Sequence, residues 1–206
     1  MAYRYDIFVS YRRDPEALLW LSQHFVPILK SRVSQELPHT ITTFVHEVTA
    51  QIPAGTAWPV ELGETIGQSR ILVALWSGNY LASEWCCQEL ALMLDREAKV
   101  KARTVANKFG LVIPVIVHDG ESIPGKLANA QHLEIKECFN SRMPVQGAKA
   151  EILADRIGIH AAGIAAAIKA APPWRKEWPK KASQQLIRAF ERQQPSQRKL
   201  PRFGRP

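Results

Sequence analysis

Short, nearly continuous apolar segments alternate along the chain with longer segments in which apolar residues recur at helical spacing. The apolar segments predict buried strands. They are YDIFVS (residues 5–10), ITTFV (41–45), ILVALW (71–76), LVIPVIV (111–117) and, with a less apolar pattern, 132–135. The amphipathic segments predict helices over 16–35, 58–68, 84–102 and 148–170. Strands that alternate with helices imply right-handed βαβ units, so we expect a flavodoxin-like, doubly wound α/β domain with a five-stranded parallel sheet.

Polar, aromatic and glycine residues concentrate in the loops that follow the predicted strands. These loops span residues 10–15, 46–58, 77–85 and 118–126. In open parallel sheets, ligands bind outside the carboxyl ends of the strands. The loop 46–58 is long for a strand-to-helix connection, and long loops in compact domains are often functional. We therefore expect the functional site at this edge of the sheet.

The charge of the chain is divided unevenly along its length. The formal net charge is +8, but residues 1–171 hold 17 basic and 17 acidic residues, whereas residues 172–206 hold ten basic and two acidic ones. This composition predicts a domain over residues 1–172 and a basic extension, 173–206, that is partly helical or disordered. Two interpretations of the extension stay open. Its prolines at 195, 201 and 206 favour a solvated tail, while its charge would attract acidic or phosphate-rich partners, nucleic acid included.

The sequence carries no feature of a secreted or membrane protein. No apolar run approaches the roughly 20 residues of a membrane-spanning helix, and the amino-terminal MAYRYDIFVS lacks the apolar stretch of a signal peptide. Cys86 and Cys87 are neighbours and Cys138 stands alone, which provides neither a disulfide framework nor a metal-ligand spacing. We expect a cytoplasmic protein without a metal and without membrane contact.

Several enzyme and signalling classes with a related fold are excluded by the strand ends. A phospho-acceptor receiver domain needs an aspartate after the third strand, where this chain has Ser77. A Rossmann dehydrogenase needs a glycine-rich turn after the first strand, where this chain has Tyr11-Arg12-Arg13. A nucleoside deoxyribosyltransferase-like enzyme, in which a glutamate attacks a ribosyl carbon, uses related chemistry, but the motifs of this sequence fit that class less well.

Three segments together resemble the Toll/interleukin-1 receptor (TIR) domain family. YDIFVSYRR (residues 5–13) resembles the first box of that family. The loop that contains IPAG (52–55) before Trp58 is similar to its BB loop. SEWCCQEL (83–90), after the third strand, resembles the segment in which Trp-Cys-x-x-Glu opens the third helix. The resemblance covers residues 4–170 and is closest to the NAD-cleaving, bacterial-type branch.

The resemblance implies a catalytic role for Glu89. In enzymatic TIR domains the catalytic acid is the glutamate four residues after the tryptophan, here Trp85. The two residues are spaced i, i+4 and share one helical face. Cleavage of the nicotinamide–ribose bond passes through an oxocarbenium-like cation that a carboxylate stabilises. Nicotinamide leaves as a neutral molecule, so no general acid is needed. The alternative is a surface carboxylate favoured by the helix dipole.

Seven further residues are predicted to bind the substrate. Arginine guanidinium groups bind a pyrophosphate through paired donors, and aromatic rings stack on the bases. In the TIR family, a serine after the third strand lies near the ribose. An aspartate of the family lies near the position of the glutamate in this chain. These residues are Tyr11, Arg12, Arg13, Glu47, Trp58, Ser77 and Trp85. Each also has a structural alternative, a surface pair for the arginines and core packing for the aromatic residues.

The resemblance therefore predicts an NAD⁺ glycohydrolase or cyclase that gives nicotinamide and linear or cyclic ADP-ribose. NAD⁺ is then a substrate, and no cofactor is required. Such a domain would serve as an effector in signalling, innate immunity or antiphage defence. Self-association through TIR–TIR contacts would activate it, and a head-to-tail contact can propagate into a filament. The alternative is a non-enzymatic adaptor that acts only through TIR–TIR contacts.

Overall fold

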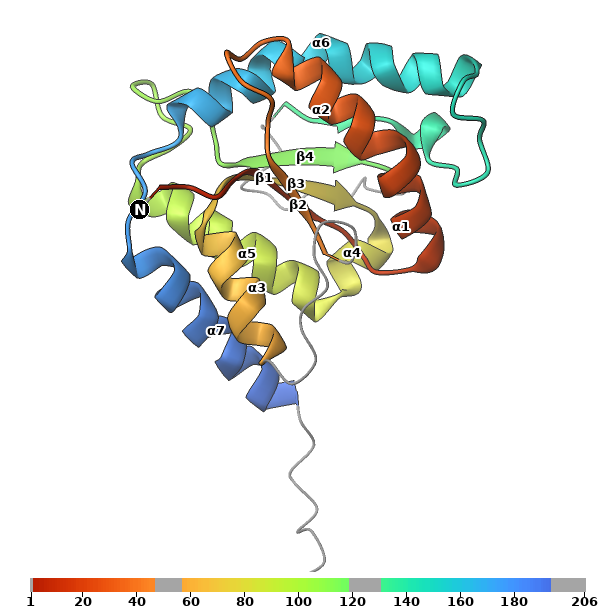
Figure 1. Ribbon diagram of the computed structural model, residues 1–206. Helices are drawn as coiled ribbons and strands as arrows, with labels where there is room; N and C mark the ends of the chain where they lie inside the picture. The colour runs from red at the N-terminus through yellow and green to blue at the C-terminus, as the bar shows by residue number, and fades with distance from the viewer. Residues whose placement is uncertain (1, 47–56, 119–130, 194–206) are drawn as a thin grey trace, which may run out of the picture.

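A parallel β-sheet forms the centre of the molecule (Figure 1). The computed structural model describes residues 2–46, 57–118 and 131–193. Within these ranges the strands are β1 (Tyr5–Ser10), β2 (Thr43–Val45), β3 (Ser69–Trp76), β4 (Val112–Ile116) and β5 (Leu133–Glu134). They lie in the order β2-β1-β3-β4-β5, and every pair is parallel. The predicted five-stranded parallel sheet is confirmed, with β2, β4 and β5 shorter than their apolar segments.

Helices cover both faces of this sheet (Figure 1). One face carries α1 (Pro15–Trp20), the π-helical turn η1 (Leu21–Phe25), α2 (Val26–Ser34) and α6 (Ala148–Ala170), and a 3₁₀ turn, η2 (Lys136–Cys138), lies beside α6. The other carries α3 (Trp58–Gly67), α4 (Gly78–Ala82) and α5 (Glu84–Lys99), and α7 (Glu177–Gln193) packs against α3 and α5. Each helical layer encloses its own hydrophobic core against the sheet. The predicted doubly wound α/β architecture is therefore confirmed.

Two adjacent buried charges attach α5 to the sheet. The Arg96 guanidinium donates to the carbonyl oxygens of Ser69 (2.8 Å) and Ile66 (3.1 Å). The Glu97 carboxylate accepts from the backbone N–H groups of Leu111 (2.5 Å) and Val112 (2.8 Å). Buried charges are costly unless such partners replace water. These bonds therefore fix the height of α5 relative to β3 and β4.

Helix α5 ends three residues before its predicted limit at residue 102. Lys101 and Arg103 adopt positive φ angles of 53° and 56°, which are incompatible with a continuing right-handed helix. Arg103 instead turns back, and its Nε atom donates to Glu97 at 3.1 Å. The end of α5 is thus tied to the same carboxylate that anchors it to β4.

The basic extension predicted from residue 173 is helical up to Gln193 and packs on the domain. Ala182 and Leu186 of α7 belong to the core beneath α3 and α5, and Ser183 Oγ donates to the carbonyl oxygen of Val60 at 2.9 Å. The predicted division at residue 172 therefore does not coincide with a break in the packing. Residues 194–206 lie outside the described ranges. No helix within those ranges is long and apolar enough to cross a membrane.

Helices α3 and α7 approach each other at backbone distance. A Cβ atom added to Gly63 would lie 2.4 Å from the Cα of Ser183, and one added to Gly67 would lie 2.4 Å from the Cα of Pro179. Because the second pair runs backwards along α7, the two helices are antiparallel. This crossing brings the carboxyl end of α7 to the start of α3, at Trp58.

We expect Gly63→Ala to destabilise the protein by about 1–3 kcal/mol, because its methyl group overpacks against the backbone of α7. The matched control is Gly163→Ala in α6, where nothing lies within 4 Å of the added Cβ. That change should stabilise the protein by about 0.5–1 kcal/mol, since alanine favours the helix. Urea unfolding of both variants measures the difference. Equal stability of the two variants would contradict the close approach of α3 and α7.

Candidate functional site

Glu89 lies at the carboxyl edge of the sheet. It is the sixth residue of α5, and its side chain faces the end of β1. Ser10 Oγ, on the last residue of β1, donates to Glu89 Oε2 at 2.6 Å. Only 7% of Glu89 is exposed. The carboxyl group is therefore enclosed against the strand end, and the alternative of a helix-surface carboxylate is wrong for this residue.

A hydrogen-bonded chain of hydroxyl groups leads to Glu89. Ser10 Oγ lies 2.8 Å from the hydroxyl of Tyr80 in α4, which is fully buried. Ser10 gives its proton to Glu89, and the Tyr80 hydroxyl, which is also a donor to the carbonyl oxygen of Cys86 at 3.4 Å, lies at hydrogen-bond distance behind it. The Cys86 thiol, one turn before Glu89 on α5, donates to the carbonyl oxygen of Tyr11 at 3.4 Å. These bonds hold α4, α5 and the end of β1 together around the carboxyl group.

Burial raises the pKa of Glu89 to about 7, because removal from water disfavours the charged carboxylate. The hydrogen bond from Ser10 and the charge of Arg13 act in the opposite direction and lower the pKa. Near neutral pH the carboxyl group therefore exchanges between its neutral and ionised forms. Strongly shifted carboxyl groups are concentrated at functional sites, although structural networks also produce them.

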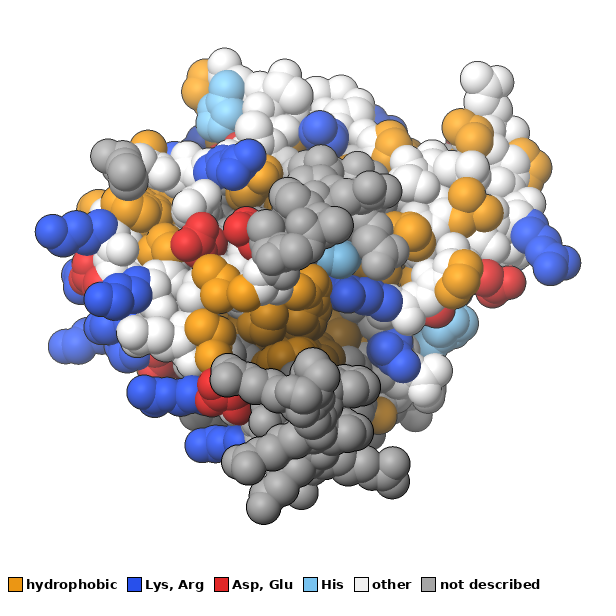
Figure 2. Space-filling view, turned by 60° about the horizontal axis from the view of Figure 1, so that its bottom comes forward, with side chains coloured by type: hydrophobic (Ala, Val, Ile, Leu, Met, Phe, Trp, Pro, Cys, Tyr) orange, Lys and Arg blue, Asp and Glu red, His pale blue; other side chains and the backbone are white. Residues whose placement is uncertain are grey.

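Aromatic rings and one cation form a cluster around Trp85, one turn before Glu89 on α5. The Arg13 guanidinium lies 4.8 Å from the ring centroid of Trp58, which meets Trp85 edge to face with the centroids 4.3 Å apart. Phe190 of α7 reaches the other side of Trp85 at 6.1 Å. Trp58 Nε1 also donates to His46 Nε2, at 3.3 Å. Figure 2 shows hydrophobic side chains at the centre of the face where α3 begins and α7 ends.

The structure brings together four of the predicted site residues, Glu89, Arg13, Trp58 and Trp85. Other predicted residues occupy different places. They are Tyr11, which is buried with its hydroxyl donating to the carbonyl oxygen of His46 (3.1 Å), Ser77, which caps α4 by accepting from Tyr80 N (3.1 Å), and Arg12, which is exposed. Glu47 lies outside the described residues.

Sequence reasoning did not assign Ser10, Tyr80 or Phe190 to the site. The sequence does contain a signal for Ser10 as a site residue. It is the polar residue that ends an apolar strand, as Ser77 is the polar residue that follows β3. Tyr80 lies in the strand-end loop 77–85 and Phe190 in the basic extension, but their places beside Glu89 and Trp85 depend on the short helix α4 and on the packing of α7, which the sequence did not predict. The three cysteines are free thiols, and burial raises the pKa of Cys86 to about 12.

The family model of the TIR domain matches residues 7–144. This segment is more than half of the chain and contains most of β1, all of β2 to β5, and α5 with Glu89. The chain belongs to the TIR domain family. Helices α6 and α7 follow the matched segment.

Two solved TIR structures are similar to this TIR domain. The first is the TIR domain of the Toll-related receptor TRR-2 from the lower metazoan Hydra magnipapillata, with 21% identity over 63% of this chain and 83% of that one, and a TM-score of 0.45. The second comprises the TIR domains of the activated Roq1 resistosome, which directly recognises the pathogen effector XopQ. It has 21% identity over 90% of this chain and 99% of that one, and a TM-score of 0.39.

We expect Ser10→Ala to raise the pKa of Glu89 further, by about one pH unit, because the carboxylate loses a donor. Tyr80→Phe is the matched control. It removes a hydroxyl from the same chain of hydrogen bonds but keeps the donor to Glu89, so the pKa of Glu89 should stay at about 7. A ¹³C NMR titration of the glutamate carboxyl carbons measures both. Titration of Glu89 at the same pH in Ser10→Ala and wild type would contradict the assigned role of Ser10.

Proposed function

We propose that this TIR domain cleaves the nicotinamide–ribose bond of NAD⁺, with Glu89 as the catalytic residue. The observation that carries the proposal is the enclosed Glu89 carboxyl group at the carboxyl edge of the sheet, with one hydroxyl donor and a pKa of about 7. The TIR family includes NAD-cleaving members, in which a glutamate follows the tryptophan by four residues, as Glu89 follows Trp85 here.

The ionised form of Glu89 supplies what this reaction needs. As the bond between nicotinamide and C1′ breaks, its electron pair goes to the nicotinamide nitrogen, and positive charge develops on the ribosyl ring. A carboxylate already removed from water interacts strongly with that charge and needs no solvent reorganisation when it forms. Water then adds to C1′ and loses a proton, which gives ADP-ribose. Attack by the adenine ring instead would give a cyclic product.

The residues around Glu89 suit the remaining parts of the substrate. Arg13 presents a guanidinium group that can pair with a diphosphate, and it lies over Trp58. The half-buried rings of Trp58 and Trp85 offer apolar surface for a base. Arg12 and Glu47 remain predicted substrate-binding residues. Ser77 and Tyr11 remain so as well, although each already holds a hydrogen bond within the domain.

The aromatic surface beside the site favours self-association as part of this function. Phe190 is 37% exposed, and Trp58 and Trp85 are half-buried next to it. A second copy that covers these rings would bury apolar surface and remove water from the neighbourhood of Glu89. We propose that the domain acts in this assembled form, as a cytoplasmic effector of signalling or immunity. A non-enzymatic adaptor would use the same surface without cleaving NAD⁺.

We expect Glu89→Gln to reduce nicotinamide release from NAD⁺ by about 10²-fold or more, since the amide keeps the shape but loses the charge. In wild type, activity should rise with pH through about 7 as Glu89 ionises. Nicotinamide release by concentrated protein, followed by chromatography from pH 5 to 9, measures both effects. Full activity of Glu89→Gln would remove Glu89 from the mechanism, and an inactive wild type would favour the adaptor.

The same variant provides a control for folding. The raised pKa means that neutral Glu89 stabilises the fold relative to its charged form. This contribution is fully present below the ordinary value of 4.5 and is lost as the pH rises through about 7. Glu89→Gln should therefore melt at a higher temperature than wild type at pH 8, and the difference should shrink toward pH 5. A variant that melts below wild type at pH 8 would contradict the burial of the carboxyl group.

Self-association predicts that turnover per molecule depends on protein concentration. We expect specific activity to rise over a dilution series from nanomolar to tens of micromolar protein, because the assembled form dries the site. Light scattering on the same samples reports assembly, and Glu89→Gln at each concentration gives the background. Turnover that stays constant while the scattering increases would show that assembly does not activate the enzyme.

A further inference from the structure

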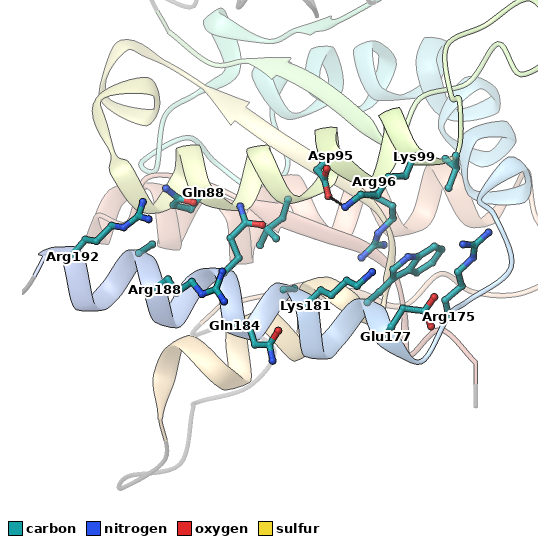
Figure 3. Close-up of a pocket in the computed structure, with 16 residues that line it drawn as sticks. Gln88, Asp95, Arg96, Lys99, Arg175, Glu177, Lys181, Gln184, Arg188 and Arg192 are labelled. Atoms are coloured by element: carbon teal, nitrogen blue, oxygen red, sulfur yellow. Dashed lines mark hydrogen bonds and ion pairs between the residues drawn. The ribbon is translucent and has the colours of Figure 1, made fainter.

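A concave site lies between α5 and α7, and the residues that line it do not include Glu89. This cavity, here the α5–α7 groove, has a volume of about 500 Å³, within the range of small-molecule sites. Figure 3 shows side chains of both helices in it, with Lys181, Arg188 and Arg192 along α7 and Gln88, Asp95 and Lys99 along α5. Its α7 wall lies outside the segment that matches the TIR family model.

The α5–α7 groove is strongly basic. Six basic and two acidic side chains line it, a formal excess of four positive charges in a domain whose residues 1–171 are balanced. Figure 2 shows Lys and Arg side chains along the side of the molecule on which α7 lies. A cavity lined by charges of one sign concentrates the electrostatic potential inside it, and a positive potential attracts an anionic ligand.

Two of the six basic side chains already have partners. Arg96 holds the carbonyl oxygens of Ser69 and Ile66 and lies 4.4 Å from the ring centroid of Trp178, while Lys99 pairs with Asp95. Burial lowers the pKa of Arg96 to about 10, so it stays charged at neutral pH. On α5, Arg96 therefore supplies a fixed positive charge, while the charge of Lys99 is offset by Asp95.

The basic side chains of α7 differ from those of α5. Lys181 and Arg188 are exposed, and neither forms an ion pair with any residue in the described parts of the chain. At 1.5 Å per helical residue, Lys181 and Arg188 are about 10 Å apart along the axis, and Arg192 follows about 6 Å further on. Cations spread over this length match several anionic groups in a row better than one compact anion.

We propose that the α5–α7 groove binds a small ligand that carries a chain of phosphates, such as a nucleoside triphosphate or an inorganic polyphosphate. Phosphate oxygens would pair with Lys181, Arg188 and Arg192, and the side-chain amides of Gln88 and Gln185 supply neutral donors. Two facing helical walls hold a ligand between them. This geometry favours a small molecule over duplex nucleic acid, because duplex readout requires a protruding element that enters a groove of the duplex.

Charge-matched double variants of the full chain test this proposal. Lys181→Gln/Arg188→Gln removes two charges that line the groove, and Lys176→Gln/Lys180→Gln removes two exposed charges beside it that do not line it. We expect wild type to bind inorganic tripolyphosphate in isothermal titration calorimetry. The first variant should bind it about tenfold more weakly or worse, since two charge-assisted contacts are lost. The second should change affinity by less than about twofold.

The same experiment also shows which kind of ligand binds and which results would contradict the proposal. ATP that binds more tightly than tripolyphosphate would support the proposal with a nucleotide as the ligand, and equal affinities would support it with the phosphate chain alone. Equal weakening by both double variants would overturn it, because the effect would then follow net charge. Binding of duplex DNA without binding of tripolyphosphate or ATP would also overturn it. Thermal melts of both variants, expected to match wild type, exclude loss of folding as the cause.

Discussion

The attachment of α5 to the sheet is the constraint on which the candidate site depends. Arg96 and Glu97, adjacent on this helix, bind carbonyl oxygens on the α3–β3 side and N–H groups at the start of β4. Because a helix is rigid over two turns, fixing these residues also fixes Glu89, seven and eight positions earlier. The candidate catalytic carboxyl group is thus positioned from the far end of its own helix, by groups with no part in the chemistry.

Glu89 in turn completes an arrangement built from three separate elements. Ser10 ends β1, Tyr80 lies in α4, and Glu89 projects from α5. None of these elements alone would hold a carboxyl group away from water at this edge of the sheet. The raised pKa of Glu89 is therefore a property of the tertiary structure and not of its local sequence.

The architecture could be predicted from the sequence because β1 and β3 are continuous apolar runs of residues, separated by amphipathic segments. Helical spacing also placed Glu89 and Trp85 on one helix face, while the resemblance to the TIR family was what singled out the pair. The burial of Glu89 did not, because periodicity shows which residues share a face and not what packs against it. The docking of α7 was missed for a related reason. Its apolar residues lie among many lysines and arginines, and its partners are Gly63 and Gly67, which carry no hydrophobic signal.

The close crossing of α3 and α7 also determines how this part of the molecule can move. Helices separated by a layer of side chains can slide as rotamers change. At Gly63 and Gly67, however, backbone meets backbone, and that compliance is missing. We therefore expect the two helices to move as one unit, with Trp58 at one end and the wall of the α5–α7 groove along its length. A displacement of the α7 wall would therefore also move Trp58, because α3 and α7 would shift together. No intervening side chains would have to repack.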